Sequence, residues 1–135
     1  MIKTRIYEER RDYSMIAEWW QAQGSVVPDA SQLDTLGVIV SDGDQDVAYI
    51  CAYLSVGVGV AHLDHLVTNP ACRAPMAKLR AIRALMSEIL RICKDNDYQL
   101  IKAVTWSKTL SRVCQRKLGF MRVGGGFENL SVILK

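Results

Sequence analysis

The stretch that decides the fold reads Leu63-Asp64-His65-Leu66-Val67-Thr68-Asn69-Pro70, and a long amphipathic segment follows it after Arg73. The first part ends a strand expected over Val60–Thr68, which the Asn-Pro pair terminates. From about Arg73 to Lys94 the apolar residues recur every three or four positions, which predicts a helix with one broad apolar face. A strand, a long helix and a further strand in this order predict at least one parallel pair within a mixed sheet.

Upstream of this stretch the sequence predicts mostly antiparallel pairing. The alternation over Ile2–Tyr7 predicts a strand with one buried face, and a helix follows that Asp12 or Ser14 caps and Gly24 ends. Residues 26–36 are expected to form a loop with at most one helical turn. Strands are then expected over 37–40, 47–55 and 60–68, joined at the hairpin turn 42–44 and at a second turn over 56–59.

Downstream of the long helix we expect a strand, a shorter helix and a final pair of strands. Leu100–Trp106 is rich in β-branched residues and is expected to be a strand, after which Ser107 caps a helix that stops at Gly119. Met121–Val123 and Phe127–Leu134 complete the chain. The fold class is therefore α/β (α+β): one domain over residues 1–135, with a mixed, mostly antiparallel sheet of about seven strands flanked by helices.

The bulk composition is that of an ordinary globular protein. The sequence has 135 residues, of which 50% are hydrophobic and 23% are charged, so one domain with a sizeable core is expected. Its net charge of +3 suits an anionic small ligand and is too weak to indicate nucleic acid. The amino terminus lacks the pattern of a signal peptide, and no apolar run is long enough to span a membrane.

The four cysteines, Cys51, Cys72, Cys93 and Cys114, are widely spaced and form no Cys-x-x-Cys pair. Without an export signal they are expected to be buried or half-buried thiols rather than disulfides. The two histidines and the scattered carboxylates lack the spacing of metal ligands. We therefore expect a cytoplasmic protein without a metal centre.

A second informative stretch is Ser107-Lys108-Thr109-Leu110-Ser111-Arg112-Val113-Cys114-Gln115-Arg116-Lys117-Leu118-Gly119-Phe120, a small polar residue, a helix and then Leu-Gly-Phe. Together with residues 63–70 and the order of elements, it resembles the GNAT superfamily of N-acetyltransferases; the front half resembles small phage-encoded members. The resemblance implies a single GNAT-like acyltransferase domain that uses acetyl-CoA. It also implies an amine acceptor, either a small molecule or a peptide. Homodimers are common in the superfamily, whereas nucleic acid and membrane partners are not expected.

The resemblance assigns residues to the pantetheine arm of the cofactor. In the superfamily the strand before the long helix hydrogen-bonds this arm, which implies that Leu66, Val67 and Thr68 bind it. Ser107 matches an Asn or Ser that relatives place near the pantetheine. The other interpretation of Ser107 is a plain helix N-cap, and one residue can do both.

The same resemblance places the cofactor phosphates at the start of the long helix, where free amides and the helix dipole favour anions. Arg73 matches the residue that opens the family's phosphate loop. The glycine positions of that loop hold Met76 and Lys78 in this chain, and Pro75 removes one amide donor. Lys78 could supply charge instead. Arg112 could meet the 3′-phosphate; the alternative for all three basic residues is a solvated helix surface.

Acyl transfer to an amine needs a neutral amine, a polarised carbonyl and a protonated leaving thiolate. Asp64 matches the position where many relatives carry Glu or Asp, so the resemblance assigns the amine proton to it. A period of two puts His62 on the same face as Asp64 and His65 on the other face. The candidate catalytic pair is therefore Asp64 and His62; the alternative is a hydrogen-bonded pair at the strand edge.

The proton donor to the leaving thiolate is harder to assign. Relatives often carry Tyr four residues before the Gly of Leu-Gly-Phe, but this position holds Gln115, whose amide is not an acid. Cys114 beside it falls on the apolar side of the helix and is expected to be a core thiol. Tyr53, Tyr98 and water remain as donors.

Aromatic residues of the first helix have two interpretations. In the superfamily this helix helps to line the acceptor pocket, so Tyr13, Trp19 and Trp20 could contact the acceptor. Packing of the same rings on the sheet is the alternative. The same two interpretations apply to Trp106, at the end of the strand that follows the long helix.

The sequence as a whole favours an acyl-CoA-dependent N-acyltransferase, with acetyl-CoA as donor and direct attack by a bound amine. The missing glycine loop and tyrosine favour an alternative, a catalytically weak or inactive module of the same fold that binds a ligand or partner. A third class, nucleic-acid modification or binding, would need a concentrated basic patch that the sequence does not display.

Overall fold

The computed structural model describes residues 1–33, 36–105, 108–123 and 128–134. The strands in this part of the chain form one sheet with the order β1-β2-β3-β4-β5-β7-β6. They are β1 (Ile2–Ile6), β2 (Leu36–Asp42), β3 (Gln45–Leu54), β4 (Val60–Thr68), β5 (Leu100–Thr105), β6 (Met121–Arg122) and β7 (Glu128–Ile133). The helices are α1 (Glu9–Ala22), α2 (Pro75–Asp95) and α3 (Lys108–Lys117), and a short 3-10 helix, η1, covers Ala30–Gln32.

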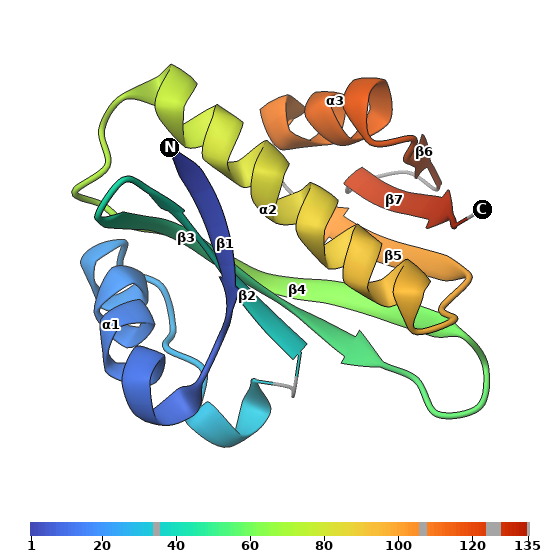
Figure 1. The fold of residues 1–135 in the computed structure, drawn as a ribbon, viewed down its shortest axis with the longest axis horizontal. Coiled ribbons are helices and arrows are strands. Elements are labelled where there is room, and N and C mark those ends of the chain that lie inside the picture. Colours follow the sequence, from blue (N-terminus) through green and yellow to red (C-terminus); the bar gives the residue numbers. More distant parts are fainter. Residues whose placement is uncertain (34–35, 106–107, 124–127, 135) are drawn as a thin grey trace.

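Neighbouring strands pair antiparallel, with the exception of β4 and β5, which run parallel. Helix α2 connects these two strands across one face of the sheet (Figure 1). A parallel pair requires such a crossover, since a hairpin can join only antiparallel strands. The structure thus confirms the expected fold class, a single mixed, mostly antiparallel seven-stranded domain flanked by three helices.

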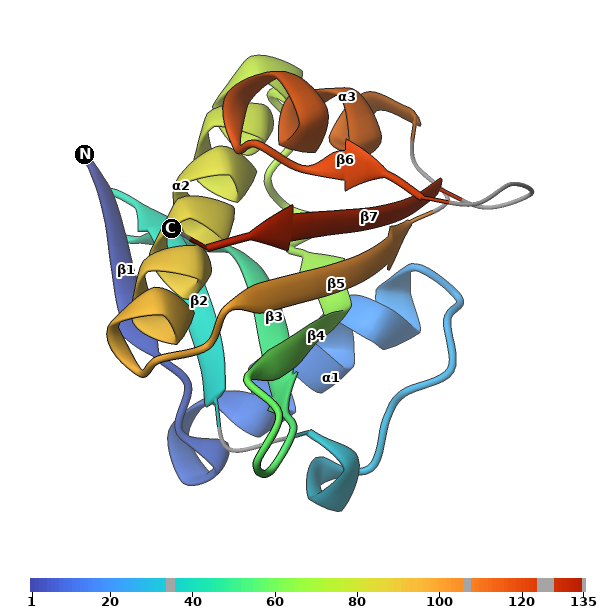
Figure 2. The ribbon, with the colours of Figure 1, turned by 90° about the vertical axis from the view of Figure 1, so that its right-hand side faces the viewer.

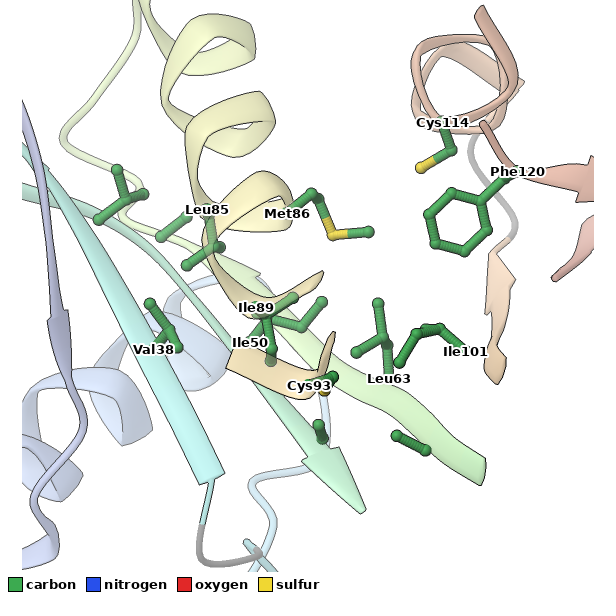
Figure 3. Packing of buried hydrophobic residues seen from close by; sticks show 14 of the residues in the cluster. Val38, Ile50, Leu63, Leu85, Met86, Ile89, Cys93, Ile101, Cys114 and Phe120 are labelled. Carbon is green, nitrogen blue, oxygen red and sulfur yellow. The ribbon is translucent and has the colours of Figure 1, made fainter. Parts of the chain in front are cut away.

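The two faces of the sheet carry separate cores. Helices α2 and α3 cover one face and α1 covers the other (Figures 1 and 2). Successive side chains of β2 alternate accordingly: Val38 and Val40 join the core under α2, whereas Ile39 joins the core under α1. Figure 3 shows Leu85 and Ile89 of α2 above Val38 and the neighbouring strands. Burial of these apolar side chains is the main stabilising contribution to the fold.

Helix α1 begins at Glu9, three residues before the earliest cap expected from the sequence, so the prediction that Asp12 or Ser14 caps it is wrong. The N-cap position is Glu8, whose side chain makes no capping hydrogen bond. Instead the Glu8 amide donates to Oδ2 of Asp12 at 2.8 Å. A carboxylate inside the first turns therefore satisfies an amide that would otherwise lack a partner.

Asp12 is 1% exposed and is the centre of an ion-pair cluster. Its Oδ1 accepts from Arg5 Nη1 at 3.0 Å and from Arg11 Nε at 3.1 Å. Burial acts to raise the pKa of Asp12, but the hydrogen bonds from Arg11 and from the Glu8 amide, together with the charge of Arg5, hold this pKa below its ordinary value. The cluster ties β1 to the start of α1.

Helix α2 begins at Pro75, two residues later than expected. Pro75 occupies the first helical position, where an amide has no partner within the helix in any case. The Lys78 amide makes the first helical hydrogen bond, to the Ala74 carbonyl at 3.0 Å. The amides of Met76 and Ala77 therefore have no partner within the helix and are available to an anion. Pro75 thus removes fewer useful amide donors from the helix start than the sequence suggested.

Helix α3 ends as expected at Gly119. This glycine has φ +76°, and the Phe120 amide donates back to the Cys114 carbonyl at 3.1 Å. Such a bond across a left-handed residue closes many helices, and glycine adopts the conformation at little cost. The chain then reverses and buries the Phe120 ring in the core under α2 and α3.

All four cysteines are buried and none forms a disulfide, as the sequence predicted. None of the described helices has both the length and the apolar character that a membrane span requires.

Candidate active site between strands β4 and β5

Strand β4 contains a β-bulge near the centre of the sheet. Between the paired positions Asp64 and Val67, two residues of β4, His65 and Leu66, face the single residue Ile50 of β3. His65 has φ +59°, a left-handed conformation that residues other than glycine rarely adopt. Its amide donates to Oδ1 of Asp64 at 2.7 Å. A bulge of this kind redirects the side chains that follow it.

The bulge overturns the expectation that His65 points away from the face that carries His62 and Asp64. His62 lies opposite Tyr53 in the ladder, so these two side chains share the α1 face. Nε2 of His65 lies 2.6 Å from the hydroxyl oxygen of the same Tyr53. The imidazole also meets the ring of Trp20 on α1, edge to face with centroids 6.2 Å apart. His65 therefore lies on the α1 face as well.

Strands β4 and β5 separate beyond the middle of the sheet. Their parallel register joins Val60–Leu63 of β4 to Leu100–Ala103 of β5. Past this point β4 continues beside β3 as far as Thr68, whereas β5 continues beside β7. In the second half of β4, the backbone edge that faces away from β3 is therefore not paired with β5.

A cavity of about 390 Å³ lies where the two strands separate. Met86 of α2 and Cys114 of α3 line it on one face of the sheet, and their side chains point toward each other in Figure 3. Asp64 and His65 line it from the bulge. The rest of the described lining is apolar: Ile50, Leu63, Leu66, Ala103, Val104, Leu110 and Leu130. The cavity thus joins an apolar interior under α2 and α3 to polar groups on the α1 face.

A chain of hydrogen bonds selects one tautomer of the neutral His65 ring. The Tyr53 hydroxyl donates to the Gln32 carbonyl at 2.5 Å, and a carbonyl can only accept. Since a hydroxyl has one hydrogen, Nε2 of His65 must be the donor in its 2.6 Å contact with Tyr53. This assignment leaves Nδ1 as the basic nitrogen of the neutral ring. Oδ2 of Asp64 lies 4.0 Å from Nε2.

The structure brings Asp64 together with His65 rather than with His62, the partner expected from the sequence. Asp64 lines the cavity with a side chain that is 62% exposed, whereas the exposed His62 is not among the described lining residues. One signal in the sequence could have indicated His65. Asp64 and His65 are polar neighbours in a strand with a buried face, so one of them would enter the core unless a bulge intervenes.

The three β4 residues assigned to the pantetheine arm have different surroundings. Leu66 lines the cavity, but the Val67 side chain is buried in the core under α1. The Asn69 amide donates to a β3 carbonyl at 2.7 Å, so by alternation Thr68 directs its backbone groups away from β3, toward the gap. The Thr68 carbonyl accepts from Nε2 of Gln23 at 2.7 Å. Gln23 is a residue near the site that the sequence did not indicate.

The basic residues assigned to the phosphates lie outside the cavity. Arg73 is exposed just before α2, and Lys78 is half-buried in its first turn. Arg112 lines a separate depression of about 200 Å³ on α3, together with two other basic residues of that helix. Ser107, the fourth polar residue assigned to the cofactor, lies outside the described residues.

The side chains considered as proton donors to the leaving thiolate differ in burial and in hydrogen-bond partners. Burial raises the pKa of Cys114 to about 11, so this thiol gives up its proton less readily than an ordinary thiol. Gln115 is exposed and donates to Oγ of Ser111 at 2.9 Å. Tyr98 donates to the Ser55 carbonyl at 3.3 Å and lines a different pocket, near the end of α2. Tyr53 is beside the cavity, but its hydrogen is directed to Gln32.

The aromatic side chains of α1 mainly pack on the sheet. Trp19 and Trp20 are 5% and 6% exposed and belong to the core under α1, and the Tyr13 hydroxyl donates to the Pro28 carbonyl at 2.7 Å. The Trp20 ring contacts a described residue of the cavity lining, His65. Trp106 lies outside the described residues.

Within the part of the chain that the structure describes, no group of three or more His, Cys, Asp or Glu side chains is placed to hold a metal ion. The described chemistry of the site therefore consists of an apolar cavity, an imidazole with a defined basic nitrogen, and a carboxylate beside it.

No protein-family model matches the sequence, and no curated protein matches it either. Solved structures do match. The ribosomal-protein-S18-alanine N-acetyltransferase from Escherichia coli superposes with a TM-score of 0.76 at 12% identity, covering 100% of this chain and 95% of its own. An acetyltransferase of the GNAT family from Staphylococcus aureus gives 0.71 at 13% identity and covers 100% of both chains. The Salmonella typhimurium protein yncA, with its cofactor acetyl-CoA, gives 0.73 at 12% identity, covering 99% and 94%.

These likenesses extend over the whole chain at low sequence identity. They show that the chain has the fold of GNAT-family N-acetyltransferases, which the sequence predicted. The resemblance of the front half to phage-encoded members is not tested by them and stays a prediction.

Proposed function

We propose that this protein transfers an acyl group, most simply acetyl, from an acyl-CoA thioester to an amine. The observation that carries the proposal is the cavity between β4 and β5, because it joins an apolar interior to a carboxylate and an imidazole on the other face of the sheet. The structural neighbours support it, since those named above are acetyltransferases or bind acetyl-CoA.

Separate features of the chain fit separate parts of acetyl-CoA. The apolar walls of the cavity suit the acyl group and the pantetheine arm. The start of α2 suits the pyrophosphate, because the amides of Met76 and Ala77 lack helical partners there and Arg73 and Lys78 lie beside them. The basic depression around Arg112 suits the 3′-phosphate. When bound, acetyl-CoA would supply an acyl group activated as a thioester.

In this proposal Nδ1 of His65 is the base that accepts the proton of the attacking amine. The assignment rests on the contact of Nε2 with Tyr53, which leaves Nδ1 as the free base. Asp64, expected from the sequence to be the base, instead holds the bulge through the His65 amide and places a negative charge 4.0 Å from Nε2. Asp64 therefore fixes the position of the ring that accepts the proton.

Water supplies the proton that the leaving thiolate needs. As the nitrogen–carbon bond forms and the carbon–sulfur bond breaks, the amine proton passes to His65. None of the described side chains around the cavity is a suitable acid, because the Cys114 proton is held more tightly than that of an ordinary thiol and the Tyr53 hydrogen is engaged.

The lack of a suitable acid among the described side chains around the cavity favours a second function, a binding module of this fold that has lost turnover. Gln115 stands where relatives often carry a tyrosine, and it is engaged with Ser111. Such a module would keep the cavity and the basic start of α2, but it would not release thiol from acetyl-CoA.

Thiol release from acetyl-CoA in the presence of an amine panel tests the proposal. The wild-type protein is expected to release thiol with at least one amine. His65→Asn is the matched variant, because asparagine tolerates the left-handed backbone at this position while lacking the base. We expect it to bind acetyl-CoA and release no thiol above background. Binding by the wild type without release for any amine would instead support the binding module.

A further inference from the structure

The charges of this chain are segregated by sequence segment. Residues 70–87 and 108–122 contain nine basic residues and no acidic residue. Residues 8–64 contain ten acidic residues and only two basic ones, Arg10 and Arg11. These two contributions nearly cancel to leave +1, and Lys3 and Arg5 bring the net charge to +3.

The fold places the helical parts of these segments on opposite faces of the sheet. The basic segments form the first half of α2, all of α3 and the residues next to them, on one face of the sheet. The acidic segment includes α1 and η1, on the other face. None of the ion pairs between described side chains involves Arg73, Lys78, Arg80, Arg83, Lys108, Arg112, Arg116 or Lys117. The basic face is thus not neutralised by the chain itself.

The cavity reaches the acidic side at the bulge. Of its described lining residues, Asp64 carries the carboxylate, and neither lysine nor arginine is among them. The Asp64 side chain is 62% exposed, and among the described ion pairs no lysine or arginine pairs with it; the neighbouring His65 ring has Nε2 4.0 Å from its Oδ2. An approaching ligand therefore meets a negative charge at this mouth of the cavity.

Asp29 adds a second negative charge on the same side. Its Oδ1 caps η1 by accepting from the amide and the hydroxyl of Ser31 at 3.1 and 3.2 Å. The same short helix ends at Gln32, whose carbonyl binds Tyr53 and thereby joins η1 to His65. Asp29 is exposed, and no basic side chain among the described residues pairs with it.

From this arrangement we infer that the acceptor is an aliphatic amine with a second cationic group, a diamine or polyamine. The inference rests on the proposed function, which makes the bulge the place where an amine reacts. Charges of one sign around a cleft raise the local concentration of oppositely charged ligands and their association rates. The anionic donor is attracted to the basic helices and the cationic acceptor to Asp64 and Asp29, while the exposed Lys102, opposite His62 in the ladder, is a positive charge on the same α1 face.

The test compares three acceptors of similar length: 1,5-diaminopentane, 1-aminopentane and 5-aminopentanoate. With acetyl-CoA saturating, kcat/KM is expected to be about tenfold higher for the diamine than for the monoamine, and lowest for the amino acid, at roughly 20 mM salt. The preference should shrink toward unity at about 500 mM salt, because ions screen exposed charges.

Asp29→Asn is the informative variant, since the amide oxygen can still cap η1 while the charge is lost. It should lower kcat/KM for the doubly charged diamine more than for the singly charged monoamine, so that the diamine preference falls about threefold. The matched control is Asp44→Asn, which removes an exposed carboxylate before β3, roughly 30 Å along the strand from Tyr53. It should leave the preference unchanged.

The outcomes separate this inference from the proposed function. Equal use of the three acceptors, or a preference for 5-aminopentanoate, would overturn the inference and leave acyl transfer standing. An equal loss of preference in both aspartate variants would also overturn it, because the effect would not be local to η1. Failure of every amine to release thiol would overturn the acyltransferase proposal and this inference with it.

Discussion

Nε2 of His65 lies 2.6 Å from the hydroxyl oxygen of Tyr53, and that hydroxyl donates to the Gln32 carbonyl at 2.5 Å. The two contacts together decide which ring nitrogen carries hydrogen. They also connect the bulge in β4 to η1 through a single side chain of β3. The geometry of the proposed base therefore depends on a residue that need not touch either substrate.

Tyr53→Phe should impair the chemical step more than the binding of acetyl-CoA. The variant removes the acceptor that holds Nε2–H, so the ring can rotate and adopt the other tautomer. We expect kcat to fall about tenfold, equivalent to roughly 1.4 kcal/mol, in steady-state kinetics. The free energy of unfolding should fall by only about 1 kcal/mol.

Tyr98→Phe is the matched control for this variant. Tyr98 is also a partly buried tyrosine that donates to a backbone carbonyl, that of Ser55 at 3.3 Å, but it is remote from the cavity. A similar loss of kcat in both variants would contradict a positioning role for Tyr53.

His62 and His65 should differ sharply on substitution. His65→Asn removes the proposed base, and we expect thiol release to fall about 100-fold or more, the usual contribution of general base catalysis. His62→Asn should retain most of the activity, because His62 is exposed and outside the described cavity lining. The reverse order of activities would restore the pair of Asp64 and His62 that the sequence indicated.

Asp12 should make folding stability sensitive to acid. Its pKa is lowered in the folded state, so its contribution is complete above the unfolded value of about 4 and is lost as pH falls through the folded value. Asp12→Asn should cost about 2 kcal/mol at pH 7, because it removes the buried carboxylate that pairs with Arg5 and Arg11, while Arg5 keeps Asp46 and Arg11 keeps Glu8. Urea unfolding at several pH values measures both effects.

The variant should also lose stability less steeply than the wild type between about pH 5 and pH 2. Parallel curves of unfolding free energy against pH for the two proteins would show that Asp12 titrates alike in the folded and unfolded states.

Gly37 should be intolerant of even a methyl group. A Cβ at this position would lie 2.8 Å from Cε2 of Tyr49 and 2.9 Å from Cβ of Tyr7, well inside van der Waals contact. Both tyrosines belong to the core under α1, so neither can move freely. Gly37→Ala is expected to cost about 1–3 kcal/mol in chemical denaturation. An unchanged denaturation midpoint would mean that the two rings can be displaced at no cost.

Much of the fold followed from local signals in the sequence. Strand β4 has the expected bounds, Val60–Thr68, because apolar alternation and the Asn69-Pro70 pair mark it clearly. The end of α3 at Gly119 followed from glycine's preference for the left-handed conformation. The start of α1 was misplaced because Asp12 resembles a cap in sequence, whereas its burial and its arginine partners appear only in the folded chain.

The candidate site was predicted in part. Asp64 was identified and does line the cavity, but His65 was placed on the wrong face because a period of two cannot represent a bulge. The pairing of Tyr53 with Gln32 and His65 joins residues distant in sequence and left no local signal. The separation of charge is present in the sequence as two basic segments and an acidic one, but the net charge of +3 conceals it, and the fold shows which faces the helices of these segments cover.

The central claim, that the cavity between β4 and β5 binds an acyl-CoA, is tested most directly by thermal unfolding with and without acetyl-CoA. Ala103→Phe is the informative variant, because Ala103 lines the cavity and a phenyl ring would fill part of its volume. At about 100 times the dissociation constant, acetyl-CoA should stabilise the wild-type protein by about 2.7 kcal/mol and leave Ala103→Phe unshifted. An unshifted wild type, or an equal shift in the two proteins, would contradict the claim.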